Sequence, residues 1–333
     1  MNIKLHENAW TVLVDDFDFT TATQSDADQI ARLVSSNIAV VVTGPNVEKL
    51  TPEDQVKFCS MIGHLEEYEQ DTAWGRAIAL SGDEVGKKMQ RVTGEVNGEG
   101  HPGLFGHNEE LDWHNNTPWD PKRKPMVWLK SIRNSEGCRT SWSNTILAFN
   151  DLKKEDPDFI AELEEKNYRI VCGYKQEGGH TSMYNYWSEF GELQSEVHSN
   201  ASAMPLVFTN ETGHTGFFLP YLQTFNLYGL SLEESTAILD KIWKYCQQEK
   251  YIYHHDWAPG GAELVIAEQW NSVHKRFEFD GMKQRMMHRI AFDYTNTSWW
   301  PNIKDKFNKQ IMSALKQNIR ERRQLEKINA GLV

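Results

Sequence analysis

The stretch of this chain that decides how the rest is interpreted is LDWHNNTPW, which runs from Leu111 to Trp119. If it forms a β-strand, residues two apart share a face, because successive side chains on a strand point to opposite sides. Asp112, His114 and Asn116 are then expected to point the same way. The stretch therefore predicts a cluster of polar side chains on one face of a strand.

Short apolar runs that follow this stretch predict many further strands. They are residues 126–132, 168–172, 206–209, 217–221, 251–257, 264–267 and 286–294. Many short strands with a few peripheral helices favour a jelly roll or a sandwich over a parallel α/β sheet. We therefore expect an α+β, mainly β fold, a double-stranded β-helix (jelly roll) flanked by helices.

The first third of the chain adds two helices and a strand to this picture. Ser25 is expected to cap a helix over residues 26–35. The apolar run 38–42 reads as a buried strand. Thr51 precedes Pro52, which is typical of a helix start, and Gly63 suits the end of that helix.

Two later segments complete the expected organisation of this domain. Ser231 opens a capping box and predicts a helix to about residue 248. Residues 86–106 are rich in glycine and polar residues, which predicts a loop that can cover a binding site.

The tail from residue 302 onward is expected to form an amphipathic C-terminal helix. Its apolar stripe repeats every four residues and consists of Ile303, Phe307, Ile311, Leu315 and Ile319. The stripe can pack on its own domain or make a homo-oligomer, and both alternatives stay open. We divide the chain into a jelly-roll domain, residues 1–300, and a C-terminal helical extension, residues 301–333.

Composition narrows the class of protein. The net charge of -12 argues against a surface that coats nucleic acid. No apolar run is long enough to span a bilayer, and the first residues do not resemble a signal peptide. The four cysteines are scattered and form no CxxC pair, which indicates buried thiols in a reducing compartment. We expect a cytoplasmic protein with a small-molecule substrate and neither nucleic acid nor membrane as a partner.

A second polar cluster lies far downstream of the first. The segment WNSVH ends at His274, and the run RMMHR follows at residues 285–289. Two histidines and one carboxylate on strands form the ligand face of non-haem iron oxygenases, with open positions for co-substrate and oxygen. An arginine on a neighbouring strand can bind the distal carboxylate of 2-oxoglutarate through two hydrogen bonds.

Together these motifs resemble those of the taurine dioxygenase (TauD/TfdA) family over roughly residues 28–294. His114, preceded by a tryptophan, resembles the family's first iron ligand. His274 matches the distal iron ligand. Arg285, eleven residues further on, matches the arginine that binds 2-oxoglutarate.

The resemblance implies roles for further residues. The segment GCRTSW stands where the family has GGDTxW, whose threonine helps to hold 2-oxoglutarate, which implies Thr140. Arg289 matches a position that binds an anionic substrate group in some members, and it is expected at the carboxylate of the substrate or of the co-substrate 2-oxoglutarate. Arg139 places a cation where the family has an acid, and it is expected near the substrate together with Trp113.

The resemblance also implies a reaction. Fe(II) would be the cofactor, and 2-oxoglutarate and O2 would be the co-substrates. An unactivated C–H bond of a small, amino-acid-like or anionic substrate would be hydroxylated.

The sequence departs from the family at the third iron ligand, where Asn116 replaces a carboxylate. A neutral amide oxygen binds a hard divalent ion more weakly. Four interpretations stay open. Asn116 or water completes the iron site and turnover persists; Asp112 supplies the carboxylate; an anion such as chloride takes the position, as in related halogenases. In the fourth, the chain is an iron-deficient binding protein with an anion pocket around Arg139, Arg285 and Arg289.

Overall fold

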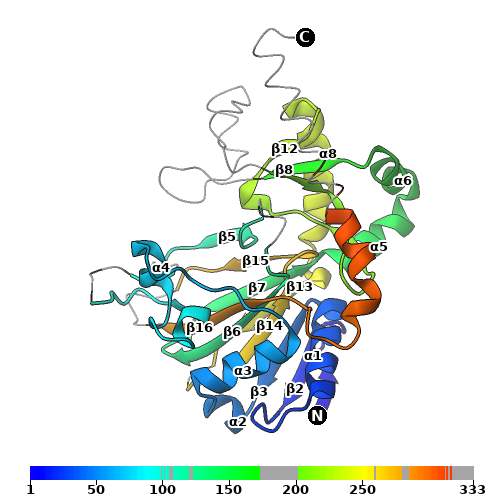
Figure 1. Cartoon of the computed structure of the whole chain (residues 1–333). Coiled ribbons are helices and arrows are strands. Elements are labelled where there is room, and N and C mark those ends of the chain that lie inside the picture. Colours follow the sequence, from blue (N-terminus) through cyan, green and yellow to red (C-terminus); the bar gives the residue numbers. More distant parts are fainter. Residues whose placement is uncertain are drawn as a thin grey trace.

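The computed structural model shows a mixed α/β fold in which two sheets, both almost entirely antiparallel, face each other (Figure 1). It describes residues 1–98, 100, 102–104, 108–118, 120, 123–172, 202–258, 260–279, 285–311, 313 and 316.

The larger sheet has seven strands in the order β1-β2-β3-β14-β6-β16-β4. All its neighbours pair antiparallel except β2 and β3, which are parallel. The strands are β1 Asn2–Leu5, β2 Val12–Asp15, β3 Ala39–Thr43, β4 Gln90–Val92, β6 Met126–Arg133, β14 Glu263–Glu268 and β16 Met286–Phe292.

The smaller sheet has four strands in the order β13-β7-β15-β5, all antiparallel. They are β13 Ile252–Asp256, β7 Arg139–Asn144, β15 Ser272–Arg276 and β5 Leu111–His114. A three-stranded sheet and a hairpin extend the fold beyond it. Their strands are β12 Thr224–Leu227, β8 Arg169–Cys172 and β9 Ser202–Pro205, then β10 Val207–Thr209 and β11 Thr215–Phe217.

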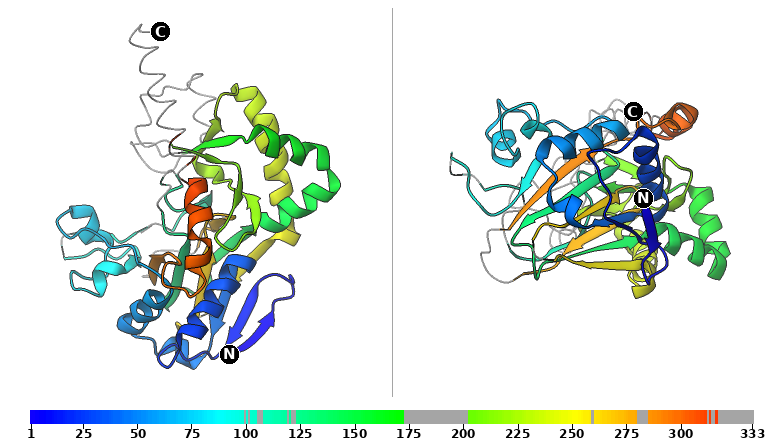
Figure 2. Two further views of the ribbon diagram at one scale, coloured as in Figure 1. Left: turned by 45° about the vertical axis from the view of Figure 1, so that its right-hand side comes forward. Right: turned by 90° about the horizontal axis from the view of Figure 1, so that it is seen from below.

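The helices gather in two groups (Figure 2). The first group covers the larger sheet and consists of α1 Gln24–Asn37, α2 Pro45–Glu48 and α3 Pro52–Ile62. The second lies at the other end and consists of α5 Thr145–Glu155, α6 Pro157–Lys166 and α8 Leu232–Cys246. The short elements are α4 Ala73–Ile78 and the 3-10 helices η1 Gly86–Lys88, η2 Tyr221–Gln223 and η3 Glu249–Tyr251.

Alternation along the central strands separates a helix-facing side from a cavity-facing side. On β6, the fully buried Trp128 contacts Phe19 and Phe58 beneath the helices, with ring centroids 5.1 and 6.1 Å apart. Its neighbours Val127 and Leu129 line the cavity between the two sheets. Burial of a large apolar side chain stabilises the fold by roughly 1.5–3 kcal/mol, so this pattern fixes which face each strand presents.

The structure confirms most predicted elements and corrects one helix start. Thr51 caps α3 through a capping box with Asp54, as expected. The first helix begins earlier than predicted, because Thr23 and not Ser25 is its cap. The Thr23 side chain accepts from the backbone N–H of Asp26, whose carboxylate accepts from the Thr23 backbone in return. A reciprocal pair satisfies two helix-end donors, which a lone serine does not.

The elements that the sequence analysis missed include the longer helices α5 and α6 and the strand β4. Asn144 caps α5 with its side-chain oxygen, and Asp156 caps α6 just before Pro157. The Asp-Pro pair is a sequence signal for a helix start that the strand-rich surroundings obscured. The predicted loop 86–106 contains β4, which is buried and pairs with β16.

The predicted strand 217–221 is wrong beyond its first residue. Phe217 ends β11, and the chain turns into η2 at Tyr221. The other predicted strand runs all overlap strands of the structure.

The first part of the C-terminal tail is a helix over residues 300–311, orange in Figure 1. Its Phe307 ring lies 6.1 Å from the rings of Phe208 and Trp270, and Ile311 is buried. This part packs on its own domain. Leu315 and Ile319 lie outside the described residues, so a homo-oligomer through the helix stays a prediction.

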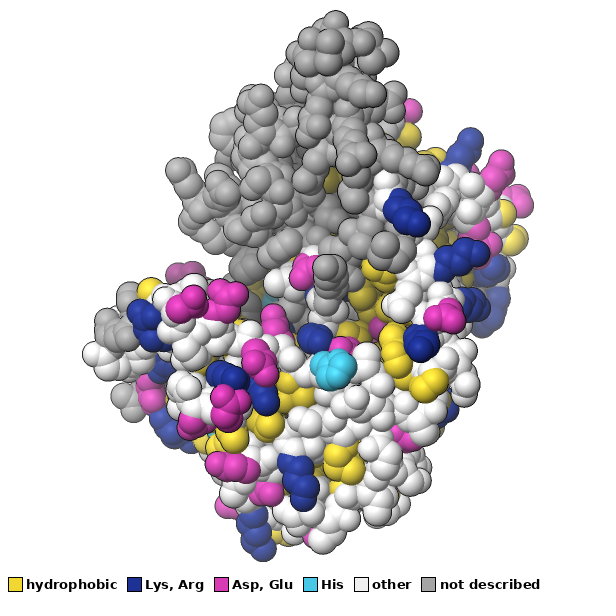
Figure 3. Space-filling view, viewed as in Figure 1, with side chains coloured by type: hydrophobic (Ala, Val, Ile, Leu, Met, Phe, Trp, Pro, Cys, Tyr) yellow, Lys and Arg dark blue, Asp and Glu magenta, His cyan; other side chains and the backbone are white. Residues whose placement is uncertain are grey.

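Acidic and basic side chains are interspersed on the described part of the face in Figure 3, without a large patch of one sign. Among the helices that the structure describes, none has the length and apolar character needed to cross a bilayer.

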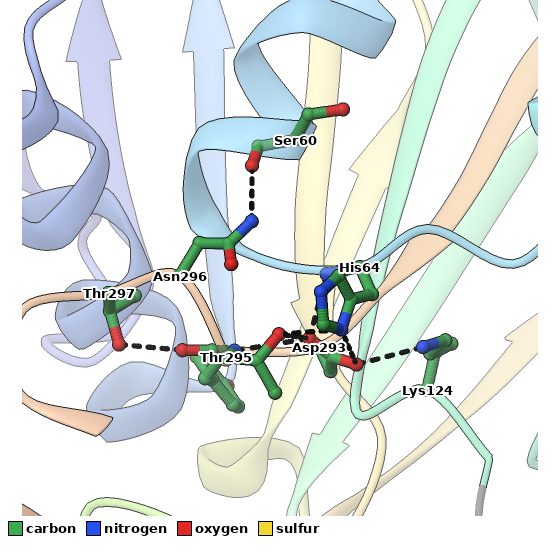
Figure 4. A network of polar contacts seen from close by, with 8 residues as sticks. Ser60, His64, Lys124, Asp293, Thr295, Asn296 and Thr297 are labelled. Carbon is green, nitrogen blue, oxygen red and sulfur yellow. Dashed lines mark hydrogen bonds and ion pairs between the residues drawn. The ribbon is translucent and has the colours of Figure 1, made fainter. Parts of the chain in front are cut away.

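A polar network joins the end of α3 to the end of β16 (Figure 4). Asp293 accepts hydrogen bonds from the His64 backbone and from Thr295, and its other oxygen lies 2.8 Å from Lys124 Nζ. Gly63 lets the two segments approach, because a Cβ there would lie only 1.9 Å from the Asp293 carbonyl oxygen.

We therefore expect Gly63→Ala to lower the free energy of unfolding by roughly 2–3 kcal/mol, since an added methyl group must displace backbone. Gly98→Ala is the matched control, because a Cβ there meets nothing within 4 Å. Urea unfolding of both variants measures the difference. Equal midpoints would show that the close approach is not needed.

Candidate active site

The cavity lies between the two sheets, and its walls differ in character. The larger sheet gives it an apolar wall of Val127, Leu129, Val265, Ala267 and Met287. The smaller sheet and the segment after β5 contribute polar side chains, which are His114, Asn116, Thr140, His274 and Arg276. Arg285 and Arg289 add positive charge, from the residue just before β16 and from β16 itself. All six residues that the sequence analysis expected to hold the metal, the co-substrate or a substrate carboxylate therefore line one cavity.

The two histidines form a direct cross-strand pair. β15 lies between β7 and β5, and its register sets His274 opposite His114. Their ring centroids are 4.1 Å apart. Residues separated by nearly half of the chain are thereby brought to one place by strand pairing alone.

Both imidazoles are held in a form that can bind a metal. His114 Nδ1 lies 2.6 Å from the Asp112 carbonyl oxygen. A carbonyl oxygen only accepts, so Nδ1 carries the proton and Nε2 carries the lone pair. Burial lowers the pKa of His274 to about 3, with Arg289 adding to the effect. His274 therefore stays neutral near pH 7, as a metal ligand must.

A β-bulge changes which residues of β5 face the cavity. Leu111 pairs with Arg276 and His114 with His274, so four residues of β5 span three of β15. An extra residue in one strand shifts its facing pattern. Leu111 and His114 both line the cavity. The expectation that Asp112 shares the face of His114 is therefore wrong.

Asp112 and Trp113 both point elsewhere. Asp112 Oδ1 lies 3.2 Å from Lys275 Nζ, and its side chain is 40% exposed. Trp113 packs edge-on against Trp243, with ring centroids 6.0 Å apart, in the core beneath α8. The structure does not support an alternative-ligand role for Asp112 or a substrate contact for Trp113.

Asn116 follows β5 and faces a second amide. Its Nδ2 donates to Oε1 of Gln269 over 2.6 Å. Gln269 is buried and comes directly after β14. Asn116 thus lies at the polar rim with its nitrogen already engaged.

Three arginines give the cavity a positive side. Arg285 is buried beside the Phe279 ring, 4.9 Å from its centroid, and burial lowers its pKa. Arg289 donates to Gln90 and lies 3.4 Å from the Tyr68 hydroxyl. Burial together with Arg285 lowers the pKa of Arg276 to about 10. A guanidinium is a permanent positive charge in proteins, so this side of the cavity suits anionic ligands.

Neighbouring residues of β7 point in opposite directions. Thr140 lines the cavity, and its hydroxyl oxygen accepts from Trp257 Nε1 over 3.0 Å. Arg139 instead forms a two-bond ion pair with Asp256 at 2.7 and 2.8 Å on the exposed side. The expected place of Arg139 in an anion pocket is wrong, because strand alternation turns it outward.

Arg276 and Gln269 were missed by the sequence analysis. Arg276 is two residues after His274 on one strand, so alternation alone would have placed it on the same face. Gln269 carried no such signal, because its contact with Asn116 spans 153 residues.

A buried ionic cluster supports the segment that leads to His274. Glu268 accepts from the backbone N–H groups of Trp270 and Asn271, and burial raises its pKa to about 7. Arg123 lies over the Trp270 ring at 4.2 Å and donates to the Gln269 carbonyl over 2.7 Å. Buried polar groups with hydrogen-bond partners of this kind hold the path of the chain, because leaving one without a partner costs free energy.

The sequence profile described as "Taurine catabolism dioxygenase TauD, TfdA family" matches residues 4–291. The chain belongs to this family. Its dioxygenases use Fe(II), 2-oxoglutarate and O2.

Relatives and a solved structure agree with the assignment to TauD/TfdA. Pentalenolactone F synthase of Streptomyces arenae is 22% identical over 200 residues, 58% of this chain and 66% of that protein. (S)-phenoxypropionate/alpha-ketoglutarate-dioxygenase of Sphingobium herbicidovorans is 28% identical over 193 residues, 55% of this chain and 63% of that protein. The chain thus spans just under two thirds of these relatives. A crystal structure of a taurine dioxygenase from Burkholderia xenovorans has a TM-score of 0.62 at 16% identity, covering 85% of each chain.

The residues present fit the family's metal in part. The neutral His274 and the fixed tautomer of His114 suit Fe(II). Among the residues that the structure describes, however, no group of three or more His, Cys, Asp or Glu side chains could hold a metal ion. In this TauD/TfdA protein, Fe(II) bound by His114 and His274 would therefore need an amide oxygen or a non-protein group as its third ligand.

Because the Asp112 carboxylate faces Lys275, we expect Asp112→Asn to leave Mn(II) affinity within twofold of wild type. His114→Ala is the matched control and should abolish binding. Calorimetric titration of the metal-free protein measures both. An equal loss in the two variants would make Asp112 a ligand after all.

Proposed function

We propose that this chain is an Fe(II)- and 2-oxoglutarate-dependent oxygenase that acts on an unactivated C–H bond of a small anionic or amino-acid-like substrate. The observation that carries the proposal is the register-matched pair of His114 and His274, which shares one cavity with Arg285. Hydroxylation is the default outcome. We further propose that the two facing sheets are the halves of a jelly roll.

Three side chains would hold the metal. His114 would bind through Nε2, because its Nδ1 is engaged with the Asp112 carbonyl. His274 would bind as a neutral imidazole, and Asn116 would offer its amide oxygen. When bound, Fe(II) with 2-oxoglutarate and O2 supplies an oxidant strong enough to hydroxylate a C–H bond.

Two side chains would orient 2-oxoglutarate. Arg285 would pair with the distal carboxylate through two hydrogen bonds, which a buried guanidinium makes well. The Thr140 oxygen already accepts from Trp257, so its own O–H is available as a donor to the same carboxylate. Together they would fix the direction in which the keto acid reaches the metal.

Arg289 and the apolar wall would select the substrate. Gln90 and Tyr68 hold the Arg289 guanidinium in place, so an anionic group that meets it finds a fixed partner. The apolar residues of the larger sheet would hold the C–H part and keep water away from it.

The residue at the third metal-ligand position, Asn116, bears on two alternative functions. An iron-deficient binding protein remains the second candidate, because Asn116 contributes no charge to the metal. A halogenase-type site needs an opened ligand position, whereas the Asn116 side chain is held at this position by Gln269. That hydrogen bond counts against a vacancy for chloride.

Anaerobic addition of Fe(II) and then 2-oxoglutarate to the metal-free protein should produce the visible charge-transfer band of the chelate. His274→Ala should remove the band, since it removes half of the imidazole pair. A missing band in the folded wild type would contradict the proposal and favour the binding protein.

Arg285→Ala should weaken 2-oxoglutarate binding by at least about 30-fold, because a charge-assisted hydrogen bond contributes roughly 1.5–3 kcal/mol and this side chain would make two. Arg139→Ala, the matched control, should change it less than twofold, since Arg139 lies outside the cavity. Titration of the band against 2-oxoglutarate measures both. A larger effect at Arg139 would overturn the co-substrate site described here.

A further inference from the structure

Asn116 and Gln269 form an amide pair whose direction the surroundings dictate. The backbone N–H of Gln269 donates to the Pro125 carbonyl over 2.8 Å. Its own carbonyl accepts from Arg123 Nη2 over 2.7 Å. Hydrogen bonds therefore hold both backbone groups of Gln269, and they set the position from which its side chain extends.

The side chain of Gln269 can adopt only one orientation without loss of a hydrogen bond. Its Nε2 donates to the Lys124 carbonyl oxygen over 2.9 Å. A backbone carbonyl only accepts, so the nitrogen end must face Lys124 and the oxygen end must face Asn116. A flipped amide would set two oxygens against each other at Lys124.

Lys124 is itself anchored. Its ammonium lies 2.8 Å from the Asp293 carboxylate, which also accepts from His64 and Thr295 (Figure 4). The carbonyl that orients Gln269 thus belongs to a segment tied to the end of β16. The direction of the amide pair follows from this framework and not from the pair alone.

An amide is the group that residue 116 needs to match this partner. Asn116 donates Nδ2 to Gln269 Oε1, so its Oδ1 is turned away from Gln269. An aspartate has no donor there and would set a carboxylate against an acceptor oxygen. Two acceptors that face each other in this partly buried contact without a shared proton repel and lose a hydrogen bond, which costs about 1–3 kcal/mol.

We propose that Gln269 is a positioning residue that selects an amide over a carboxylate at residue 116 and presents the Asn116 oxygen as a neutral third ligand beside His114 and His274. The ligand role rests on the proposed function, whereas the selection of the amide does not. The Asn116 amide then matches the hydrogen-bonding groups around it. Asn116→Asp alone is therefore not expected to restore the family's metal site of two histidines and one carboxylate.

The first test uses metal-free protein, so it is independent of metal and turnover. Asn116→Asp is made in three backgrounds: wild type, Gln269→Leu and Gln55→Leu. Gln55 is the matched control, a buried glutamine on the helix side of the larger sheet that pairs with Trp128 and His288. Asn116→Asp should lower the melting temperature by roughly 2–6 °C in the wild-type and Gln55→Leu backgrounds and by clearly less in Gln269→Leu.

The second test measures Mn(II) affinity by calorimetry, with 2-oxoglutarate present, on the single variants and on Gln269→Leu combined with Asn116→Asp. Gln269→Leu should weaken binding about tenfold, as loss of a partner behind a metal ligand does. Gln55→Leu should leave it unchanged. In the Gln269→Leu background, Asn116→Asp should raise Mn(II) affinity more than it does in wild type, because the carboxylate no longer faces an acceptor.

Each outcome decides the proposal. Equal melting shifts for Asn116→Asp in all three backgrounds overturn the selection of the amide. Equal loss of Mn(II) affinity in Gln269→Leu and Gln55→Leu overturns the positioning role, because it would show a merely structural effect. If wild type binds no Mn(II) even with 2-oxoglutarate present but the melting shifts differ as expected, the amide selection stands, while the proposed function and the ligand role fall.

Discussion

The register of β15 against its two neighbours is the constraint on which the site depends. This strand lies between β7 and β5 and sets His274 opposite both Trp142 and His114. Hydrogen bonds to both sides fix the strand, so it cannot slip without moving every side chain to the other face. The histidine pair, the cavity and the outward turn of Lys275 all follow from this register.

The motif resemblance made much of the site predictable from the sequence. It pointed to Arg285, Arg289 and Thr140, and all three line the cavity together with the histidines. Strand alternation failed at Asp112, since a bulge in β5 adds one residue that no local pattern announces. The resemblance failed at Arg139, which strand alternation turns outward beside the inward-facing Thr140.

The fold was predictable to a similar extent from local patterns. Apolar runs revealed the strands β3, β6, β13, β14 and β16 of the two sheets, and local capping patterns revealed α3 and α8. α5 and α6 were missed because their caps, Asn144 and Asp156, stand among strand-like segments without a long apolar period. The contact of Asn116 with Gln269 could not be predicted, since it depends on how three distant segments meet.

The neutral amide of Asn116, at the third metal-ligand position, changes the balance of charge in the whole cavity. Among the described lining residues, three arginines face one carboxylate, Glu268, whose pKa burial raises to about 7. A carboxylate at residue 116 would offset part of that positive charge and attract the metal. With an amide there, we expect the protein without co-substrate to bind a divalent cation more weakly and an anion more strongly than it would with a carboxylate. Within the proposed function, an anionic chelating co-substrate then supplies charge that the protein lacks, and binding of metal and co-substrate reinforce each other by the same factor.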